Sequence, residues 1–279
     1  MPPETSLVIL TTFADFLLKL TFASGISWSM SQLVTGANRR FAIWFCFLAG
    51  AGMYWIWKLS AFLKQAEISA PSDVATTYPT SIWNRFYLPG AWSSQVSMAV
   101  RVVICAYVIM LVYFLVLYVR KYMHLRRILG FTWAPPEKIR ESFVSLTQDF
   151  GLRNCELLML SGIASPATIG WVRPVVLLPA LCTGLDEAET EDILRHELHH
   201  IRRRDFLLSR IADFFQALLF FHPVAWYARR QLEFERELAC DLAVVASSPN
   251  RRLEYAECLV SFARSNEARI FDRGESISL

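Results

Sequence analysis

The sequence predicts a mainly α-helical, multi-pass membrane protein, in which three N-terminal transmembrane helices precede an α+β domain with a small β-sheet. The 279-residue chain is 54% hydrophobic and its mean hydropathy is +0.33, above what is usual in soluble globular proteins. Its longest apolar runs all lie in the first 119 residues. The rest of the chain mixes charged helical patterns with short β-branched runs.

Three apolar stretches are each long enough to cross a bilayer, which takes about 20 helical residues. They cover about residues 7–30, 41–63 and 96–119, and a polar loop of about residues 64–95 joins the last two. The first stretch has neither the basic start nor the cleavage site of a signal peptide. We therefore expect residues 1–119 to form a transmembrane region. Within its first helix, Asp15 and Lys19 are four residues apart and are expected to pair.

Basic residues predict the orientation of these helices. Arg39 and Arg40 lie in the turn after the first span, and the run RKYMHLRR ends the third, whereas the loop of residues 64–95 holds few basic residues. Cytoplasmic loops carry the excess of Lys and Arg. The N-terminus and that loop are therefore expected outside, and residues 120–279 are expected to form a cytoplasmic, membrane-associated domain.

Net charge and cysteine spacing exclude two other classes of protein. The formal net charge is only +3, so no direct binding of nucleic acid is expected. The six cysteines contain no CxxC pair and provide neither a zinc-knuckle spacing nor the disulfide framework of a small secreted domain.

The predicted cytoplasmic domain begins with a helix and continues with short strands. Four apolar residues recur at helical spacing: Ile139, Phe143, Leu146 and Phe150. Gly151 is a suitable stop for this helix. From residue 155 to residue 180, short apolar runs broken by Gly and Pro predict two or three small strands.

Three helices complete the predicted domain. Asp186 and Glu189 form a capping-box pattern that opens a helix reaching to about residue 204. An apolar helix over residues 206–221 follows and is stopped by His222-Pro223. The last helix begins near residue 224 and continues past residue 241.

The stretch LRHELHHIRRRD, residues 194–205, carries the pattern H-E-x-x-H. On a helix, His196 and His200 are one turn apart and face the same way, so both rings can reach one Zn²⁺. Glu197 would lie beside the metal and could accept a proton from a bound water molecule. A solvated, charged helix is the alternative, but it would not need four of the five histidines within residues 196–222.

A catalytic zinc site needs three protein ligands and one open position. The later stretch EFERELACD offers Glu233 and Glu237, four residues apart on one helix face, and spacing alone leaves both open. Asp205 either anchors a ligand histidine through its ring N–H or stabilises a helix end.

Four segments together resemble the BlaR/MecR-type membrane metallopeptidases, which include the β-lactam-sensing receptors of bacteria. These segments are HELHHIRRRD, the helix end FFHP, the helix ERELACD and the upstream SPATIGWVRPVVLLPA. The resemblance implies a gluzincin fold and a zinc endopeptidase of the bacterial cytoplasmic membrane. It also implies one zinc per chain, held by His196, His200 and Glu237, with Asp241 as the supporting partner of Glu237.

In related enzymes the substrate lies extended along an edge strand beside the metal helix. We place this strand at residues Pro166, Ala167, Thr168, Ile169 and Gly170. Glu197 is expected to act as the base and then to return the proton to the leaving amine. His222 either stabilises the oxyanion or only breaks the helix before Pro223.

The resemblance implies regulated proteolysis, in which the enzyme cleaves itself or a cytoplasmic transcriptional repressor. The expected partners are membrane lipid, a peptide or protein substrate and, through a possible homodimer, a second copy of the chain. A housekeeping membrane quality-control protease is one alternative, and a non-catalytic receptor that zinc only stabilises is another. Glu197 argues against the latter, because a structural zinc site needs no base. The receptors of this type also continue into a fourth transmembrane helix and a sensor domain, beyond the position where this chain ends.

Overall fold

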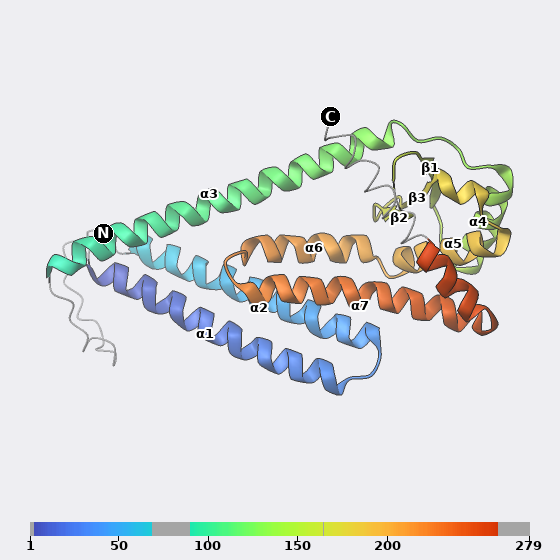
Figure 1. Cartoon of the computed structure of the whole chain (residues 1–279). Helices are drawn as coiled ribbons and strands as arrows, with labels where there is room; N and C mark the ends of the chain where they lie inside the picture. The colour runs from blue at the N-terminus through green and yellow to red at the C-terminus, as the bar shows by residue number, and fades with distance from the viewer. Residues whose placement is uncertain (1–2, 69–89, 164, 262–279) are drawn as a thin grey trace, which may run out of the picture. The chain divides into compact units, whose positions relative to one another are not determined.

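A computed structural model describes residues 3–68, 90–163 and 165–261 of the chain (Figure 1). Helices α1 to α3 come first: α1 (Pro3–Leu33), α2 (Ala37–Ile68) and α3 (Gly90–Leu129). A mixed region follows: α4 (Glu137–Asp149), β1 (Glu156–Leu160), β2 (Ala167–Ile169) and β3 (Val175–Pro179). Three more helices then follow a 3₁₀ turn: α5 (Glu187–Arg202), α6 (Asp205–Leu218) and α7 (Pro223–Ser247). The fold is therefore mostly helical with one small sheet, as predicted.

The chain packs as two compact units. The first comprises Met1–Val34, Ala42–Tyr118 and Phe214–Arg230. The second comprises Thr35–Phe41, Val119–Asp213 and Gln231–Leu279. After α3 the chain passes from the first unit to the second at Val119; the division into a transmembrane region of residues 1–119 and a domain of residues 120–279 stays a prediction. The turn between α6 and α7, however, packs with the N-terminal helices and not with the unit that holds the sheet.

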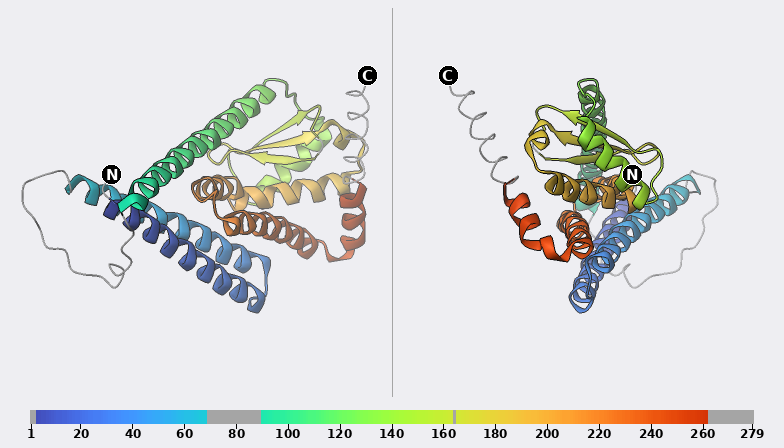
Figure 2. Two further views of the ribbon diagram at one scale, coloured as in Figure 1. Left: turned by 60° about the vertical axis from the view of Figure 1, so that its left-hand side comes forward. Right: turned by 90° about the vertical axis from the view of Figure 1, so that its right-hand side faces the viewer.

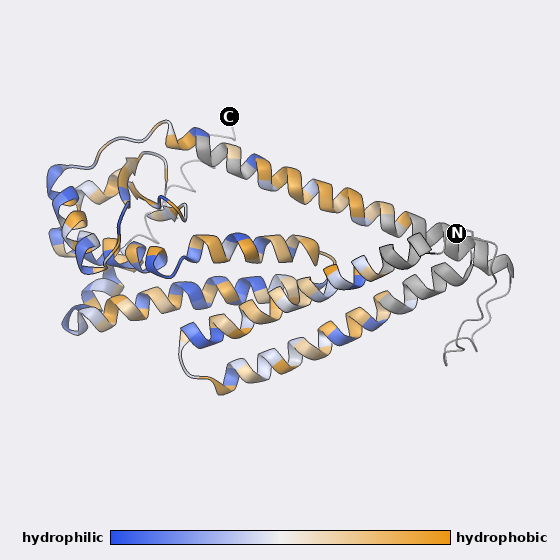
Figure 3. Ribbon diagram, turned by 180° about the vertical axis from the view of Figure 1, so that it is seen from behind, coloured by the Kyte–Doolittle hydropathy of each residue, from blue (hydrophilic) through white to orange (hydrophobic). Residues whose placement is uncertain are grey.

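Each of the three expected spans lies within a longer helix. By length and composition, one helical segment in the described ranges can cross a membrane, Ala37–Ala61, and Cys105–Arg120 is a shorter apolar helix. Three spans therefore stay a prediction. Residues 69–89 of the expected outer loop lie outside the described residues. Helices α3 and α6 are coloured largely as hydrophobic in Figure 3.

Aromatic side chains pack the first unit. Phe16 of α1 is 1% exposed and lies against the ring of Trp55 of α2, with ring centroids 4.6 Å apart. Trp44 and Leu48 of α2 are buried as well. The charged pair expected in α1 is present, with Lys19 Nζ 2.8 Å from Asp15 Oδ2.

The second unit is built on a three-stranded sheet in the order β1-β3-β2, with β1 parallel and β2 antiparallel to β3 (Figure 2). The central strand β3 is buried because α4 and α5 contribute apolar side chains to the same core. That core holds three of the four residues predicted on the face of α4: Ile139, Phe143 and Leu146. Gly151 follows the end of α4 with φ +64°, a left-handed conformation that suits glycine at a helix end.

The capping box predicted for α5 is confirmed. The Glu189 backbone N–H donates to Asp186 Oδ1 at 2.6 Å, and the Asp186 N–H donates to Glu189 Oε2 at 3.2 Å. Two of the amide groups at the helix start therefore have side-chain partners. This cap fixes where α5 begins and hence which residues of α5 face the rest of the second unit.

We expect Asp186→Ala to lower the stability of the protein by about 1 kcal/mol, because it removes the acceptor of the Glu189 N–H. Thermal unfolding in detergent measures the change, expected as a fall of about 3 °C in Tm. Asp186→Asn keeps an acceptor at this position and should stay close to wild type. A Tm of Asp186→Ala equal to that of wild type would show that the cap contributes nothing.

Candidate metal centre

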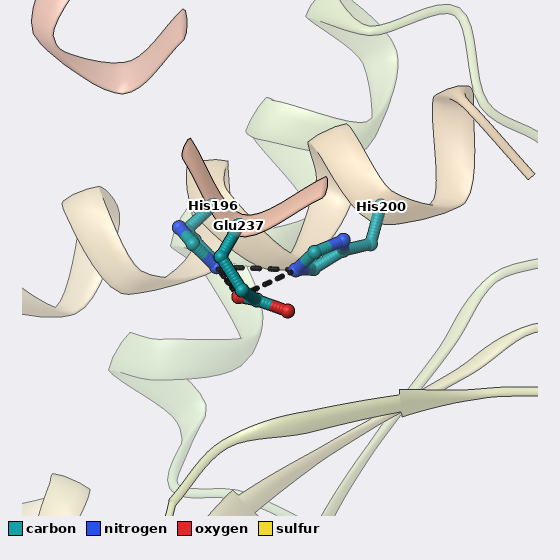
Figure 4. A group of neighbouring side chains, drawn as sticks. All are labelled: His196, His200 and Glu237. Atoms are coloured by element: carbon teal, nitrogen blue, oxygen red, sulfur yellow. Dashed lines mark hydrogen bonds and ion pairs between the residues drawn. The ribbon is translucent and has the colours of Figure 1, made fainter. Parts of the chain in front are cut away.

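Helix α5 brings two imidazole rings together one turn apart. The Nε2 atoms of His196 and His200 are 3.1 Å apart, and both side chains are mostly buried. Glu237 comes from α7, and its Oε2 lies 3.4 Å from His196 Nε2 and 3.6 Å from His200 Nε2 (Figure 4). Figure 4 shows the three side chains pointing toward one another. Of the two glutamates that spacing leaves open, Glu237 therefore lies at the histidine pair.

The three donor atoms fit a zinc ion by chemistry and by spacing. Two ligands that hold one Zn²⁺ tetrahedrally at about 2.0–2.1 Å are about 3.4 Å apart. The three distances of this cluster, 3.1, 3.4 and 3.6 Å, lie close to that value. Two imidazoles and one carboxylate are also a donor set that leaves a fourth position for water or substrate. Their role as ligands stays a prediction that this geometry supports.

Both ligand histidines are held through their other ring nitrogen. His200 Nδ1 lies 2.8 Å from Asp205 Oδ2, and His196 Nδ1 lies 3.0 Å from Asp241 Oδ1. An Nδ1–H that donates to a carboxylate leaves the Nε2 lone pair free for a metal. Asp205 thus lies where the sequence offers an anchor for a ligand histidine, whereas Asp241, expected to support Glu237, contacts His196 instead. Asp205 is also the first residue of α6, so its role at a helix end stays a prediction beside its contact with His200.

Two residues of this network escape sequence reasoning. Arg236 donates from Nε and Nη2 to Glu237 Oε1, at 3.0 and 2.6 Å, and from Nη1 to Ser209 Oγ at 2.9 Å. These hydrogen bonds from Arg236 occupy Oε1 of Glu237, while Oε2 faces the two histidines. The Tyr255 hydroxyl donates to Asp241 Oδ1 at 2.8 Å and lies 3.1 Å from His196 Nδ1. Arg236 is at least adjacent to the ligand in sequence, whereas no motif points to Tyr255.

The carboxylates dominate the electrostatics of the cluster. Burial by itself lowers the pKa of His196, but the hydrogen bonds to Asp241 and Glu237 outweigh it and raise that pKa to about 9. In His200, burial acts in the same direction, and Asp205 with Cys240 and Glu237 raises the pKa to about 12. Burial raises the pKa of Glu237, but the two histidines overcome it and hold that pKa far below its usual range. Without a metal, the histidine pair therefore retains protons at neutral pH.

Cys240 lies beside this cluster without forming a separate one. Its Sγ is 3.4 Å from His200 Nδ1 and 3.9 Å from Asp205 Oδ2, and the side chain is fully buried. The three residues could hold a metal by proximity. The same Nδ1 atom, however, is already engaged by Asp205, so we treat Cys240 as part of the support of His200.

Glu197, the expected base, is 5% exposed. The Thr168 hydroxyl donates to Glu197 Oε2 at 2.6 Å. Thr168 is the middle residue of β2, which lies at an edge of the sheet. The predicted substrate strand is therefore an edge strand beside the metal helix, with Pro166 before it and Gly170 after it. Gly170 has φ +83°, and a Cβ there would lie 2.9 Å from the carbonyl oxygen of Arg173.

His222 belongs to the first unit and serves the start of α7. Its Nδ1 accepts the Val224 backbone N–H at 3.2 Å, and its Nε2 lies 3.4 Å from Thr21 Oγ1. These contacts support the helix-break interpretation. Among the described contacts of His222, none supports an oxyanion role.

We expect the metal-free chain to bind one Zn²⁺ with release of about one proton or more at pH 7. The raised pKa values of His196 and His200 mean that protons must leave before Nε2 can bind the metal. Affinity should therefore fall, and the number of protons released should rise, as the pH is lowered from 8 to 6. Calorimetric titration in buffers of different ionisation enthalpy measures both quantities; a heat independent of the buffer would contradict the expectation.

Glu237→Gln and Glu233→Gln form a matched pair for the same titration. Loss of a supporting residue typically weakens a metal site about 10–100-fold, so loss of a ligand in Glu237→Gln should exceed that. Glu233, four residues earlier on α7, is exposed, and its variant should bind zinc like wild type. Equal affinities for the two variants would exclude Glu237 as a ligand.

Comparisons with known proteins agree with the geometry. The family model of the BlaR1 peptidase M56 matches residues 28–274. Regulatory protein BlaR1 of Bacillus licheniformis is 32% identical over 101 residues, which are 36% of this chain and 17% of that protein. Methicillin resistance mecR1 proteins of Staphylococcus aureus (strain Mu50) and Staphylococcus epidermidis are 24% identical over 102 residues, again 36% of this chain and 17% of theirs. The matched region thus spans about a sixth of these relatives. The chain belongs to the BlaR1 peptidase M56 family.

Proposed function

We propose that the chain is an integral-membrane zinc endopeptidase that hydrolyses peptide bonds on the cytoplasmic side of the bacterial inner membrane. The observation that carries the proposal is the convergence of His196, His200 and Glu237 on one point, next in sequence to the buried Glu197. Membership of a peptidase family supports the same reaction class. One zinc per chain would occupy the cluster.

Each residue of the centre has a defined task in such a reaction. Zinc, when bound, would lower the pKa of a water molecule and polarise the carbonyl of the scissile bond. Glu197 would take the proton from that water and then deliver it to the leaving amine. The Thr168 hydroxyl holds one oxygen of the Glu197 carboxylate, so the other oxygen is the one available for the proton.

The edge strand offers a binding mode for the substrate. An extended peptide can add to β2 by main-chain hydrogen bonds, because β3 pairs with only one side of that strand. Thr168 would then connect substrate binding with proton transfer, since the strand that receives the peptide also positions Glu197. This mode places no requirement on particular substrate side chains beyond those that fit beside β2.

The proposed location rests on the apolar helices. Segment Ala37–Ala61 is long and apolar enough to span a bilayer, and the apolar runs of α1 and α3 would supply the other two spans. The basic residues after the first and third spans support an orientation with the N-terminus outside and the second unit in the cytoplasm. A homodimer is compatible with this arrangement.

The proposed biological role is regulated signalling proteolysis, by self-cleavage, by cleavage of a transcriptional repressor or by both. The names of the relatives, a regulatory protein and methicillin resistance proteins, support it. The housekeeping alternative would require cleavage of many unrelated membrane proteins. Identification of the fragments that accumulate with the active protein, and not with an inactive variant, separates the two roles.

Glu197→Gln is the direct test of the enzyme. We expect peptide cleavage to fall by roughly 10²–10⁴-fold, because the amide cannot accept the proton, while zinc content stays at that of wild type. Glu191→Gln, on the same helix, changes a half-exposed carboxylate paired with Arg195 and should leave activity unchanged. If Glu197→Gln cleaved peptides at the wild-type rate, the proposed enzyme mechanism would be wrong, and a receptor that zinc only stabilises would be the better interpretation.

Thr168→Val tests the positioning of the base. Loss of a hydrogen bond to a charged group costs about 1.5–3 kcal/mol, so we expect kcat to fall by roughly tenfold or more with zinc binding unchanged. Thr168→Ser keeps the hydroxyl and should restore most of kcat. If Ser and Val lower kcat equally, the effect comes from strand packing and not from the hydrogen bond to Glu197.

A further inference from the structure

The hairpin tip between α6 and α7 is free of charge. Residues 214–228, FFQALLFFHPVAWYA, contain no Asp, Glu, Lys or Arg. Asp213 precedes this stretch and pairs with Arg210 at 2.9 Å, and Arg229 and Arg230 follow it. The chain enters the first packing unit at Phe214 and leaves it after Arg230. The uncharged stretch and this segment of the packing unit therefore begin at the same residue and end within two residues of each other.

Rings of the hairpin tip pack on all three N-terminal helices. Phe221 lies 5.3 Å from the ring of Phe13 of α1 and 5.5 Å from that of Trp55 of α2. Phe220 stacks at 5.5 Å on Tyr107 of α3, and Tyr227 meets Trp44 of α2 at 5.4 Å. The tip is thus an integral part of the apolar helical bundle.

Gly52 of α2 allows α6 to approach closely. A Cβ at this position would lie 2.1 Å from a ring carbon of Phe215, which no side chain at position 52 could accommodate without a shift of the ring. Small residues at such contacts are typical of helix packing within membranes, where close backbone approach replaces the hydrophobic driving force.

Several polar groups of the turn have hydrogen-bond partners within the protein. The Tyr107 hydroxyl donates to the Leu218 carbonyl at 3.1 Å, and Trp226 Nε1 donates to the Phe220 carbonyl at 2.8 Å. The His222 N–H donates to the Leu219 carbonyl at 3.0 Å. A helix end in water needs no such partners, whereas in hydrocarbon each unsatisfied group costs several kcal/mol. The turn is built as a turn inside a bilayer must be.

We propose that this tip, residues 214–228, is a re-entrant hairpin inserted in the bilayer, with lipid acyl chains on its outer face. Phe214 is 58% exposed, Trp226 44% and Tyr227 43%, so an apolar surface remains that helices of the unit do not cover. Eight residues from Phe214 to the turn rise only about 12 Å, less than half of the ~30 Å hydrocarbon core. The hairpin therefore enters and leaves on the same side. The inference rests on the proposed membrane location and adds to it a fourth inserted element.

Two phenylalanines of nearly equal exposure allow a matched test. Phe214 lies inside the uncharged stretch, and Phe234, 60% exposed, lies on α7 beyond it. Each is changed to Cys in a background in which Cys46, Cys105 and Cys155 are replaced by Ala and the buried Cys182, Cys240 and Cys258 are kept. A charged, membrane-impermeant maleimide is then applied to opened native membranes, and to the same samples after unfolding in sodium dodecyl sulfate. Leu18→Cys, at a 73% exposed position of α1, is the reference for a residue within the proposed first membrane span.

We expect Phe214→Cys and Leu18→Cys to react roughly tenfold or more slowly than Phe234→Cys in membranes, because hydrocarbon excludes the reagent and the reactive thiolate form. After unfolding, all three should react alike. If Phe214→Cys reacts as fast as Phe234→Cys while Leu18→Cys stays protected, the hairpin proposal fails and the membrane location stands. If Leu18→Cys also reacts fast, the membrane location itself fails, and with it the hairpin.

Discussion

The structure depends on holding three electron-pair donors within about 3.6 Å of one another. Two imidazole nitrogens 3.1 Å apart and a carboxylate oxygen beside both repel or compete for protons unless a cation joins them. Three neighbouring side chains in the second unit hold these donor atoms in place. Asp205 and Asp241 contact the Nδ1 atoms of the two rings, and Arg236 donates to the Oε1 atom of Glu237. Because the groups are held before any metal arrives, the chain pays for the site in folding stability, as functional sites commonly do.

Asp205 shows how much of the fold serves this arrangement. It is 2% exposed, and its carboxylate has His200 on one oxygen and Arg203 on the other. Burial of a carboxylate is favourable only when such partners are present. The same residue begins α6, so one side chain contacts the metal helix at the point where the next helix starts. A change in the direction of α6 would therefore also change how His200 is held.

The sequence predicts local features of this protein well, because they depend on local patterns. The start of α5, the end of α4, the strands and the histidine pair all follow from periodicity, capping and motif spacing. Contacts between distant segments do not. Tyr255 is 59 residues from His196, and Thr168 is 29 residues from Glu197, so no spacing rule connects them. The choice of Glu237 over Glu233 likewise needed a family resemblance before the geometry agreed. The apolar helix over residues 206–221 was predicted as an element, but an apolar face does not say whether protein or lipid will cover it.

The hairpin and the metal centre are joined by the chain itself. α7 is one continuous helix (Pro223–Ser247), and Glu237 follows Arg230 by seven residues, about 10 Å along the axis. A metal held by residues of α5 and by Glu237 would close a loop that contains the whole hairpin tip. Because a metal that binds only the folded state stabilises that state, such a metal would oppose unfolding of a chain segment that includes the hairpin.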